Sequence, residues 1–370
     1  MRQAAGQETA RTRRKMTTPT AEVILPSPDF DATLAFFREA LGFRLDAIHP
    51  ADDPAIASLS GYGLRLRLDR DAEGPPPALR IASAEPATLL GGARAVTAPN
   101  GATVTVVQAD PPLDLPPLDQ KLTICRTDGA NGGWGVGRAG MLYRDLIPER
   151  EGGRFIASHI RIPDGGPVPD NVHFHRIRFQ MIYNYKGWVR LVYEDQGEPF
   201  VMGPGDCVLQ PPEIRHRVLE CSDGLEVIEI GSPAEHMTLL DHDLPLPTGR
   251  HLPERDYGGQ RFVLHRAEGA LWAPADMAGF EARDLGIAQA TGGLAEVAVL
   301  RQAADDVDTA VRHGGEFLFH FVLEGRLTLT VDGRGPDELA AGDSFTLPAD
   351  MPCRIGAASG PLEMLRVRIP

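Results

Sequence analysis

The chain has 370 residues, of which 42% are hydrophobic, 24% charged and 6% aromatic, with 40 glycines and 32 prolines. Such a composition is typical of a folded protein of two or three domains that is rich in turns, and it excludes collagen, coiled coils and wholesale disorder. With 51 acidic against 37 basic side chains the formal charge is −14, so phosphate backbones are repelled and nucleic acid is excluded as a partner.

The first twenty residues have the composition of a disordered tail. A basic run from Arg11 to Lys15 precedes a second methionine, Met16, and the apolar core of a secretory signal is missing. Because no stretch of about 18 apolar residues is present either, we expect a cytoplasmic protein that does not bind membranes. The four cysteines are widely spaced, which predicts reduced and mostly buried thiols.

Residues 21–109 open with the strand-like segment AEVILPS. Asp29 or Asp31 then caps a helix whose apolar residues recur at helical spacing as far as Gly42. Three strand-like segments follow, namely FRLDAIHP, GLRLRLDR and ALRIAS. The segment AVTAPNGATVTVVQ adds a hairpin-like pair of strands with an Asn-Gly turn.

The order strand, helix, strand, strand, strand, together with the phrase LAFFREALGFRL, resembles one module of the vicinal oxygen chelate family of glyoxalases and bleomycin-resistance proteins. The resemblance implies an α+β module of βαβββ order. In that family two such modules normally close one metal-binding cup, with His, Gln or Glu ligands. Only Glu22 and His49 are candidates here, so we expect a packing or dimerisation module that holds no metal.

Two linkers divide the rest of the chain. Four prolines in residues 110–122 predict an extended linker. In residues 123–247 short strands alternate with turn residues, which predicts a small antiparallel barrel or sandwich. A second linker, residues 248–260, precedes residues 261–370, where the same pattern returns. The two halves therefore look like a duplication of one β fold.

Three histidines of the first half lie at regular intervals. In GPVPDNVHFHRIRFQMIYNYKG, His173 and His175 are two residues apart, so both imidazoles project from the same face of a strand. Gln180 follows in the same segment, and His216 lies in GDCVLQPPEIRHRVLE. Three imidazoles and one amide oxygen that converge inside a barrel make a site for a divalent transition metal, with positions left open for water or substrate.

These spacings resemble the cupin superfamily, whose two motifs are G-x5-H-x-H-x3/4-E-x6-G and G-x5-P-x-G-x2-H-x3-N. The sequence has Gln180 where the family usually has Glu, and Glu213 in place of a Gly. The resemblance implies a mainly β bicupin, with two double-stranded β-helix barrels, and the metal ligands His173, His175, Gln180 and His216. Because Gln180 carries no charge, we expect weaker metal binding and a stronger Lewis acid.

Several polar side chains surround this predicted site. Strand alternation places Asn184, and Arg178 if no bulge intervenes, on the same side as Gln180. An arginine beside a metal suits an anionic substrate, whereas the alternative is that these arginines pair with acids on the barrel surface. The residues that we predict to be catalytic are Arg178, Tyr183, Arg190 and Glu213.

The second half retains few of these ligands. Aligned on the glycines that end the first motif, Val311 and Leu318 replace His173 and Gln180. His313 and Cys353 lie at the positions that match His175 and His216 of the first half. His320 and Glu316 are also candidate ligands, but they lie off the matching positions. Because two ligands do not make a tight transition-metal site, we expect a structural or substrate-shaping barrel without metal, with an irregular site as the alternative.

The resemblance to cupins with histidine-rich centres implies a dioxygenase-type oxidoreductase that acts on a small anionic or chelating organic substrate. The expected ion is Fe²⁺, with Mn²⁺, Ni²⁺ or Zn²⁺ as alternatives, and it acts as Lewis acid and template. Two other functions stay open: a metal-dependent isomerase or lyase that acts through an enediolate, and a non-catalytic bicupin that binds a small molecule. Unpaired strands and the lone N-terminal module predict a homodimer.

Overall fold

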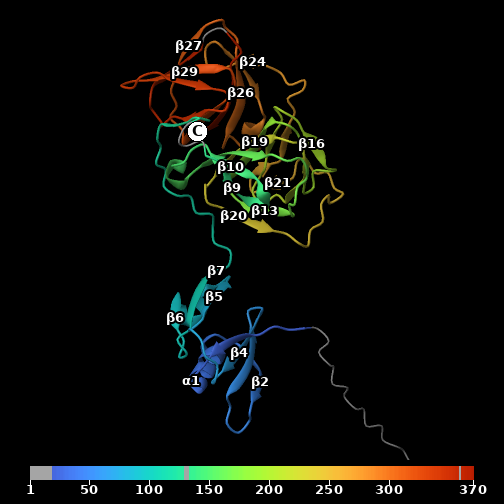
Figure 1. The fold of residues 1–370 in the computed structure, drawn as a ribbon, viewed down its shortest axis with the longest axis vertical. Helices are drawn as coiled ribbons and strands as arrows, with labels where there is room; N and C mark the ends of the chain where they lie inside the picture. Colours follow the sequence, from blue (N-terminus) through green and yellow to red (C-terminus); the bar gives the residue numbers. More distant parts are fainter. Residues whose placement is uncertain (1–18, 129–132, 358–359) are drawn as a thin grey trace, which may run out of the picture. The chain divides into compact units, whose positions relative to one another are not determined.

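The computed structural model describes residues 19–128, 133–357 and 360–370. The chain divides into two compact units, Met1–Pro112 and Leu113–Pro370, which Figure 1 colours blue to cyan and green to red. The boundary lies inside the stretch 110–122, where the sequence predicts a linker. Most of the predicted tail, residues 1–18, lies outside the described residues.

In residues 19–112 the first unit contains two small sheets, one helix formed by α1 and η1, and two single turns of 3-10 helix. The four-stranded sheet has the order β1-β4-β3-β2, with β1 parallel to β4 and the other pairs antiparallel. The three-stranded sheet has the order β5-β7-β6. The elements are β1 Val23–Pro26, α1 Phe30–Ala35 with its continuation η1 Phe36–Ala40, β2 Arg44–His49, β3 Ile56–Gly61, β4 Leu64–Asp69, β5 Ala78–Ser83, η2 Pro86–Thr88, η3 Leu90–Gly92, β6 Ala95–Thr97 and β7 Thr103–Gln108.

The order of one strand, one helix and three strands is observed, but the three strands differ from the predicted ones. The segments FRLDAIHP and GLRLRLDR form β2 and β4, but the pattern does not predict β3, because Ala, Ser and Gly make up four of its six residues. The segment ALRIAS forms β5, which pairs in parallel with β7 in the other sheet. The predicted hairpin at Asn100 and Gly101 is confirmed, since β6 and β7 pair antiparallel across that turn.

The resemblance of this unit to the vicinal oxygen chelate family stays a prediction. Its two candidate ligands, Glu22 and His49, both lie at the surface. The apolar side of α1 and η1 packs instead on the sheet, where Phe30, Phe37 and Leu25 are buried. The buried residues of this unit therefore form an apolar core.

The second unit consists of two barrels, each built of two sheets. In the first barrel the sheets have the orders β23-β17-β14-β19-β11-β10-β9 and β16-β15-β18-β13-β20, with β12 beside β18. Its elements are β9 Gly135–Val136, η4 Arg138–Gly140, β10 Leu142–Asp145, η5 Arg150–Gly153, β11 Ile156–Ile162, β12 Gly166–Pro167, β13 His173–Arg176, β14 Phe179–Lys186, β15 Val189–Tyr193, β16 Phe200–Met202, β17 Cys207–Leu209, β18 His216–Cys221, β19 Leu225–Ser232, β20 Met237–Leu240 and β23 Val263–His265.

The second barrel repeats this plan with the sheet orders β24-β25-β26-β33-β28-β31-β8 and β27-β32-β29-β30. A short hairpin, β21 Asp256–Tyr257 and β22 Gln260–Arg261, lies between the barrels in sequence. The elements of the second barrel are β8 Thr123–Cys125, β24 Ala273–Pro274, β25 Phe280–Asp284, α2 Ile287–Ala290, β26 Glu296–Gln302, β27 Val307–Val311, β28 Phe317–Glu324, β29 Arg326–Val331, β30 Asp337–Ala340, β31 Ser344–Thr346, β32 Cys353–Ala357 and β33 Glu363–Ile369. The predicted fold class is therefore confirmed.

Each barrel receives one strand from the sequence assigned to the other. β8 precedes the first barrel in the chain, yet it pairs with β31 of the second. β23 follows the second linker, yet it pairs with β17 of the first. The predicted ranges 123–247 and 261–370 do not include this exchange, because a local strand pattern does not specify the pairing partner.

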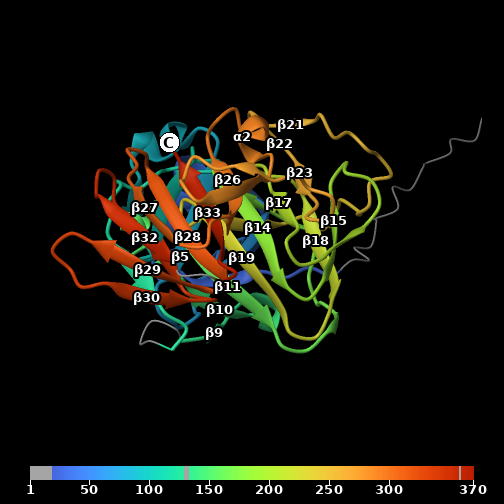
Figure 2. The same ribbon diagram turned by 90° about the horizontal axis from the view of Figure 1, so that it is seen from above.

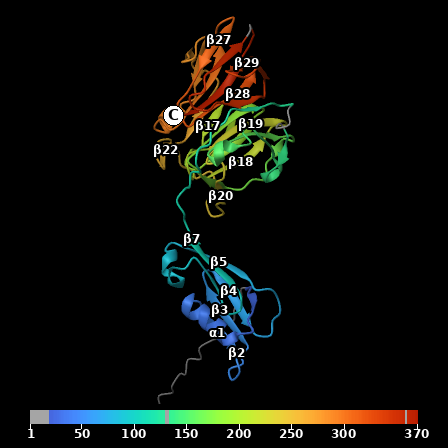
Figure 3. The same cartoon turned by 90° about the vertical axis from the view of Figure 1, so that its left-hand side faces the viewer.

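The two seven-stranded sheets pack against each other and form the largest core. Alternate residues of β14 and β28, such as Phe179, Met181, Phe317 and Phe319, belong to it. Figure 2 shows these large sheets between the two smaller ones, and Figure 3 shows the two barrels adjacent to each other. Each fully buried apolar side chain contributes about 1.5–3 kcal/mol, so this core holds the barrels together.

The four cysteines are buried and none forms a disulfide, in agreement with the prediction. Cys125 and Cys207 lie in the core shared by the two barrels, where burial raises the pKa of both thiols. In the part of the chain that the structure describes, no helix is long and apolar enough to cross a membrane.

Candidate metal centre

Three histidines of the first barrel meet on neighbouring strands. His173 and His175 lie on β13, and His216 begins β18, where it pairs directly with His173. One nitrogen from each ring lies within 4.8 Å of the other two, and the ring centres are between 4.2 and 5.3 Å apart. Across residues 19–128, 133–357 and 360–370, no other His, Cys, Asp and Glu side chains form such a group of three.

Hydrogen bonds orient the three rings. Nδ1 of His173 and Nδ1 of His216 each donate to a backbone carbonyl two residues earlier, at 2.7 and 3.0 Å. Nδ1 of His175 lies 3.0 Å from the hydroxyl oxygen of Thr238. Because Nδ1 donates in His173 and His216, Nε2 carries the lone pair in these two rings, which is how hydrogen bonds prepare imidazoles to bind a metal.

The three rings are neutral at ordinary pH. Burial, together with the neighbouring His173 and His236, lowers the pKa of His175 to about 3. Burial and the two other rings hold the pKa of His216 well below its usual value, and burial and Arg138 lower that of His173. Since a metal binds the neutral imidazole, the three side chains have the protonation state that a ligand needs.

A chain of hydrogen bonds runs past the histidines. The hydroxyl of Tyr193 donates to Gln210 Oε1 at 2.9 Å, and Gln210 Nε2 lies 3.3 Å from Gln180 Oε1 and 3.1 Å from His216 Nε2. Gln180 Nε2 donates to a carboxylate oxygen of Glu229. Gln180 therefore lies beside the triad, and its role as a fourth ligand stays a prediction.

An arginine that the sequence analysis missed contacts the triad. Nη2 of Arg138 lies 3.0 Å from Nε2 of His173, and Nη1 of Arg138 pairs with Asp170, whose side chain is 1% exposed. Asp170 also accepts a hydrogen bond from the backbone N–H of Val218 at 3.0 Å. Arg138 begins η4, the short 3-10 helix before β10, so no strand period marks it as a site residue.

The histidines line a cavity of about 380 Å³ between the two sheets of the first barrel. Its polar residues include Arg138, Gln180, Gln210 and Glu229, along with the triad. Most of the remaining wall is apolar and consists of Met141 and of residues from several strands: Ile156, Ile160, Ile162, Ile182, Val189, Leu191, Val218, Leu225 and Val227. The cavity thus combines a polar region, which contains the histidine triad, with an apolar wall.

Two of the four predicted catalytic residues are arginines that bind acids elsewhere. Arg178 donates to both carboxylate oxygens of Glu316, at 2.8 and 3.3 Å, and so joins the two barrels. Arg190 pairs with Glu220 at 3.0 Å on the neighbouring strand. Both arginines therefore form ion pairs with acids, which was the alternative to a role in binding substrate, and neither arginine lines the cavity.

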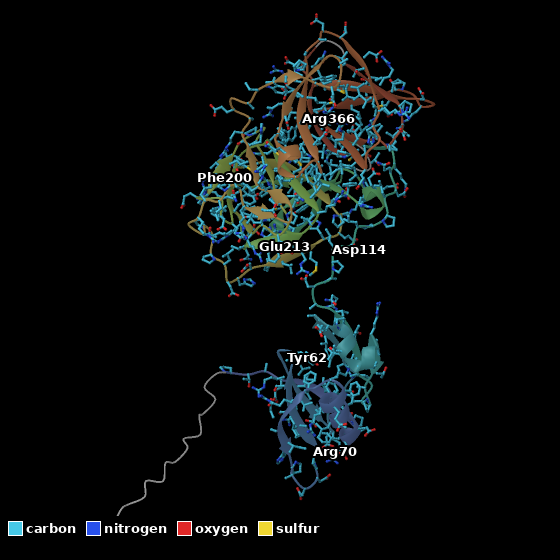
Figure 4. All side chains as sticks on the ribbon, turned by 180° about the vertical axis from the view of Figure 1, so that it is seen from behind. Tyr62, Arg70, Asp114, Phe200, Glu213 and Arg366 are labelled. Atoms are coloured by element: carbon cyan, nitrogen blue, oxygen red, sulfur yellow. The ribbon has the colours of Figure 1, made fainter. Side chains whose placement is uncertain are left out.

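The other two predicted catalytic residues also lie outside the cavity. Gln180 and Ile182 face the cavity, so alternation along β14 turns Tyr183 toward the core between the barrels, where burial raises its pKa. Glu213 is exposed and lies near Arg176. Figure 4 shows the position of Glu213 on the first barrel. Its φ of +61° explains why the cupin motif has glycine at this position.

Strand pairing confirms the alignment of the two halves. Val311 pairs with Cys353 in the second barrel, as His173 pairs with His216 in the first. Nε2 of His313 donates to a backbone carbonyl at 2.7 Å, and the Cys353 thiol lies against a backbone carbonyl as well. Apolar side chains fill most of this interior.

Comparisons with known proteins bear on the fold. Residues 300–368 match the family described as cupin domain. No curated protein matches the chain. Among solved structures, a variant of Bacillus subtilis oxalate decarboxylase is 13% identical at a TM-score of 0.48, covering 70% of this chain and 79% of its own. A variant of salicylate 1,2-dioxygenase from Pseudoaminobacter salicylatoxidans is 19% identical at a TM-score of 0.45, covering 58% of this chain and 70% of its own.

A third solved structure, protein Ylba from E. coli, is 11% identical at a TM-score of 0.49, covering 68% of this chain and 92% of its own. At these levels of similarity, strand pairing is the stronger evidence for the two barrels. The matched residues 300–368 extend from β26 to β33. The chain therefore contains a cupin domain, which lies in its second barrel.

Proposed function

We propose that the first barrel is the active site of a metal-dependent enzyme. His173, His175 and His216 hold one divalent transition metal, with Gln180 as the fourth ligand. The observation that carries this proposal is the convergence of three neutral imidazoles, with one nitrogen of each within 4.8 Å of the others, beside a cavity. Imidazole ligands suit Fe²⁺, Ni²⁺ and Zn²⁺, and we propose Fe²⁺ on the resemblance to histidine-rich cupin centres, with Mn²⁺, Ni²⁺ or Zn²⁺ as alternatives.

The proposed reaction is a dioxygenase-type oxidation of a small organic anion. When bound, the metal supplies Lewis acidity and, as Fe²⁺, electron transfer to O₂. The apolar wall of the cavity excludes water and contacts the hydrocarbon part of a substrate. A cavity of about 380 Å³ with such a wall favours a substrate that has an apolar body as well as an anionic group.

Arg138 takes the role that the sequence analysis gave to Arg178, namely binding the anionic group. Its guanidinium lines the cavity and is held by the buried carboxylate of Asp170. The same guanidinium donates toward Nε2 of His173, the nitrogen that a metal needs. Because a metal held by His173 would take the lone pair of Nε2, the N–H groups of Arg138 that point toward this nitrogen would be available for strong hydrogen bonds to a carboxylate.

A second candidate function is an isomerase or lyase that acts through an enediolate. The observation in its favour is Glu229, whose carboxylate lines the cavity and accepts a hydrogen bond from Gln180. A carboxylate in this place is able to take a proton from carbon next to a carbonyl group. Glu229 also replaces Glu213 as the proposed proton carrier.

Oxygen uptake tests the proposal. Protein reconstituted with Fe²⁺ is screened in an oxygen electrode against small carboxylic acids, diones and catechols. We expect uptake in step with one substrate, lost in His216→Ala and kept in Arg217→Gln, whose side chain is exposed on the same strand. Turnover without uptake assigns an isomerase or lyase, and full turnover by His216→Ala overturns the metal centre.

A further inference from the structure

The second barrel has a positively charged side chain at the place where the first barrel has a negatively charged one in its cavity. In the first barrel Ile182 of β14 pairs with Glu229 of β19. At the equivalent place in the second barrel, His320 of β28 pairs with Arg366 of β33. A guanidinium thus replaces a carboxylate, and an imidazole replaces an aliphatic side chain.

A cavity of about 90 Å³ remains at this place in the second barrel. Because a cavity holds one water once about 10–15 Å³ is open to a probe of that size, this volume has room for several waters or for a small anion such as acetate. Its polar lining consists of Asp276, Arg312, His313, His320, Arg366 and Arg368. Three guanidiniums and one carboxylate line the cavity, and the guanidinium of Arg312 also pairs with Asp350 at 2.8 Å.

His320 has a polar group without a partner. The residue is fully buried, its ring stacks on Phe345 at 4.7 Å, and neither ring nitrogen has a hydrogen-bond partner among the described residues. Burial and the nearby Arg366 lower its pKa to about 3, so the ring is neutral, with one N–H donor and one acceptor. Burying such a group without a hydrogen bond destabilises a protein, so a small ligand or water in the adjacent cavity would stabilise it.

Arg366 has donors that remain available. Its Nη1 binds Asp276 at 2.6 Å, and its side chain is 14% exposed. Within the part of the chain that the structure describes, Nε and Nη2 of Arg366 have no acceptor. Arg368 differs, because its two terminal nitrogens bind Asp276 and Glu296 at 3.0 and 2.7 Å.

We infer that the second barrel binds a small carboxylate, of the size of acetate, at Arg366 and His320. The carboxylate oxygens accept from the unused N–H groups of Arg366 and from the N–H of His320, whose side chain lines the same cavity. A planar guanidinium fits the two oxygens of a carboxylate, whereas chloride cannot use this geometry. The inference goes beyond the proposed function, because the site contains no metal ligand of the first barrel.

Acetate binding to the variant His216→Ala tests the inference, since this background removes acetate binding to a metal in the first barrel. Thermal unfolding and isothermal titration calorimetry are run with sodium acetate and with sodium chloride at equal ionic strength. We expect saturable stabilisation by acetate with a dissociation constant in the millimolar range, as befits a ligand of about four heavy atoms. An equal response to chloride overturns the inference.

Two further substitutions in that background identify the residues. Arg366→Gln should abolish the acetate response, whereas the matched control Arg354→Gln, an exposed arginine of β32, should keep it. His320→Phe should raise the melting temperature without acetate, because it removes an unpartnered buried group, and it should weaken acetate binding about 2- to 10-fold. An undiminished response in both Arg366→Gln and His320→Phe contradicts the site.

Discussion

Replacing Arg138 by leucine should change two affinities in opposite directions. The guanidinium donates to Nε2 of His173 at 3.0 Å, so it competes with a metal for the same lone pair. A net hydrogen bond contributes about 0.5–1.5 kcal/mol, so Arg138→Leu should tighten metal binding about 2- to 10-fold. Loss of the positive charge and exposure of the metal to Asp170 act in the same direction.

The same substitution should weaken the binding of an anion. Hydrogen bonds to a charged group contribute about 1.5–3 kcal/mol, so benzoate should bind about 10- to 100-fold more weakly, and its neutral isostere benzamide much less so. Chelator competition measures the metal affinity, and titration calorimetry on Zn²⁺-loaded protein measures the two ligands. Because Asp170 loses its partner, Arg138→Lys serves as the variant that retains a cation.

A specific result refutes this reasoning. If Arg138→Leu weakens metal binding as strongly as His216→Ala does, then Arg138 supports the metal site and does not compete with it. If benzoate and benzamide lose equal affinity, then Arg138 does not recognise the anionic group. The exposed Arg217→Gln should leave all three affinities unchanged.

Three further predictions concern Gln180, Glu226 and assembly. Gln180→Glu places a second carboxylate against Glu229, which should lower the free energy of unfolding of the metal-free protein by several kcal/mol at pH 7. Urea unfolding should show that this stability returns at pH 5 and on metal binding. An unchanged urea midpoint at pH 7 contradicts this prediction. Burial alone would raise the pKa of Glu226, but hydrogen bonds from His159 and Arg161 lower it to about 2. The stability from Glu226 is therefore present above its usual pKa near 4.5 and is lost as pH falls toward 2, so Glu226→Gln should flatten acid unfolding in that window. Light scattering at micromolar concentration should give twice the chain mass, and a monomer counts against the predicted homodimer.

The triad could be predicted because its signal is local. His173 and His175 are two residues apart on a strand, which places both rings on one face. His216 follows at the spacing that the second cupin motif requires. The alignment of Cys353 with His216 was predictable for the same reason, and strand pairing confirms it.

The surroundings of the triad depend on contacts between distant segments. Arg138 lies in η4, a single turn of helix outside the strand pattern, and only the fold brings it to His173 and Asp170. Glu229 carried a weak signal, since it is the one acid on the face of β19 that otherwise presents Leu225 and Val227 to the cavity. Arg178 and Arg190 lie near the first cupin motif in the sequence, but a sequence does not reveal which acid each arginine pairs with.

The alternation of side chains along β14 would also have shown from the sequence that Tyr183 does not face the same side as Gln180. Tyr183 is an odd number of residues from Gln180, so the two side chains lie on opposite faces. The exchange of β8 and β23 between the barrels carried no such signal, because pairing partners are chosen by the tertiary packing of both barrels.

Metal content tests the central claim most directly. Elemental analysis of protein produced with Fe²⁺, Mn²⁺, Ni²⁺ and Zn²⁺ in the medium should find about one transition metal per chain. The metal should be lost in His173→Ala and His216→Ala and kept in Cys353→Ala, the variant at the matching position of the second barrel. Full occupancy in His216→Ala, or no transition metal in the unmodified protein, would contradict the account.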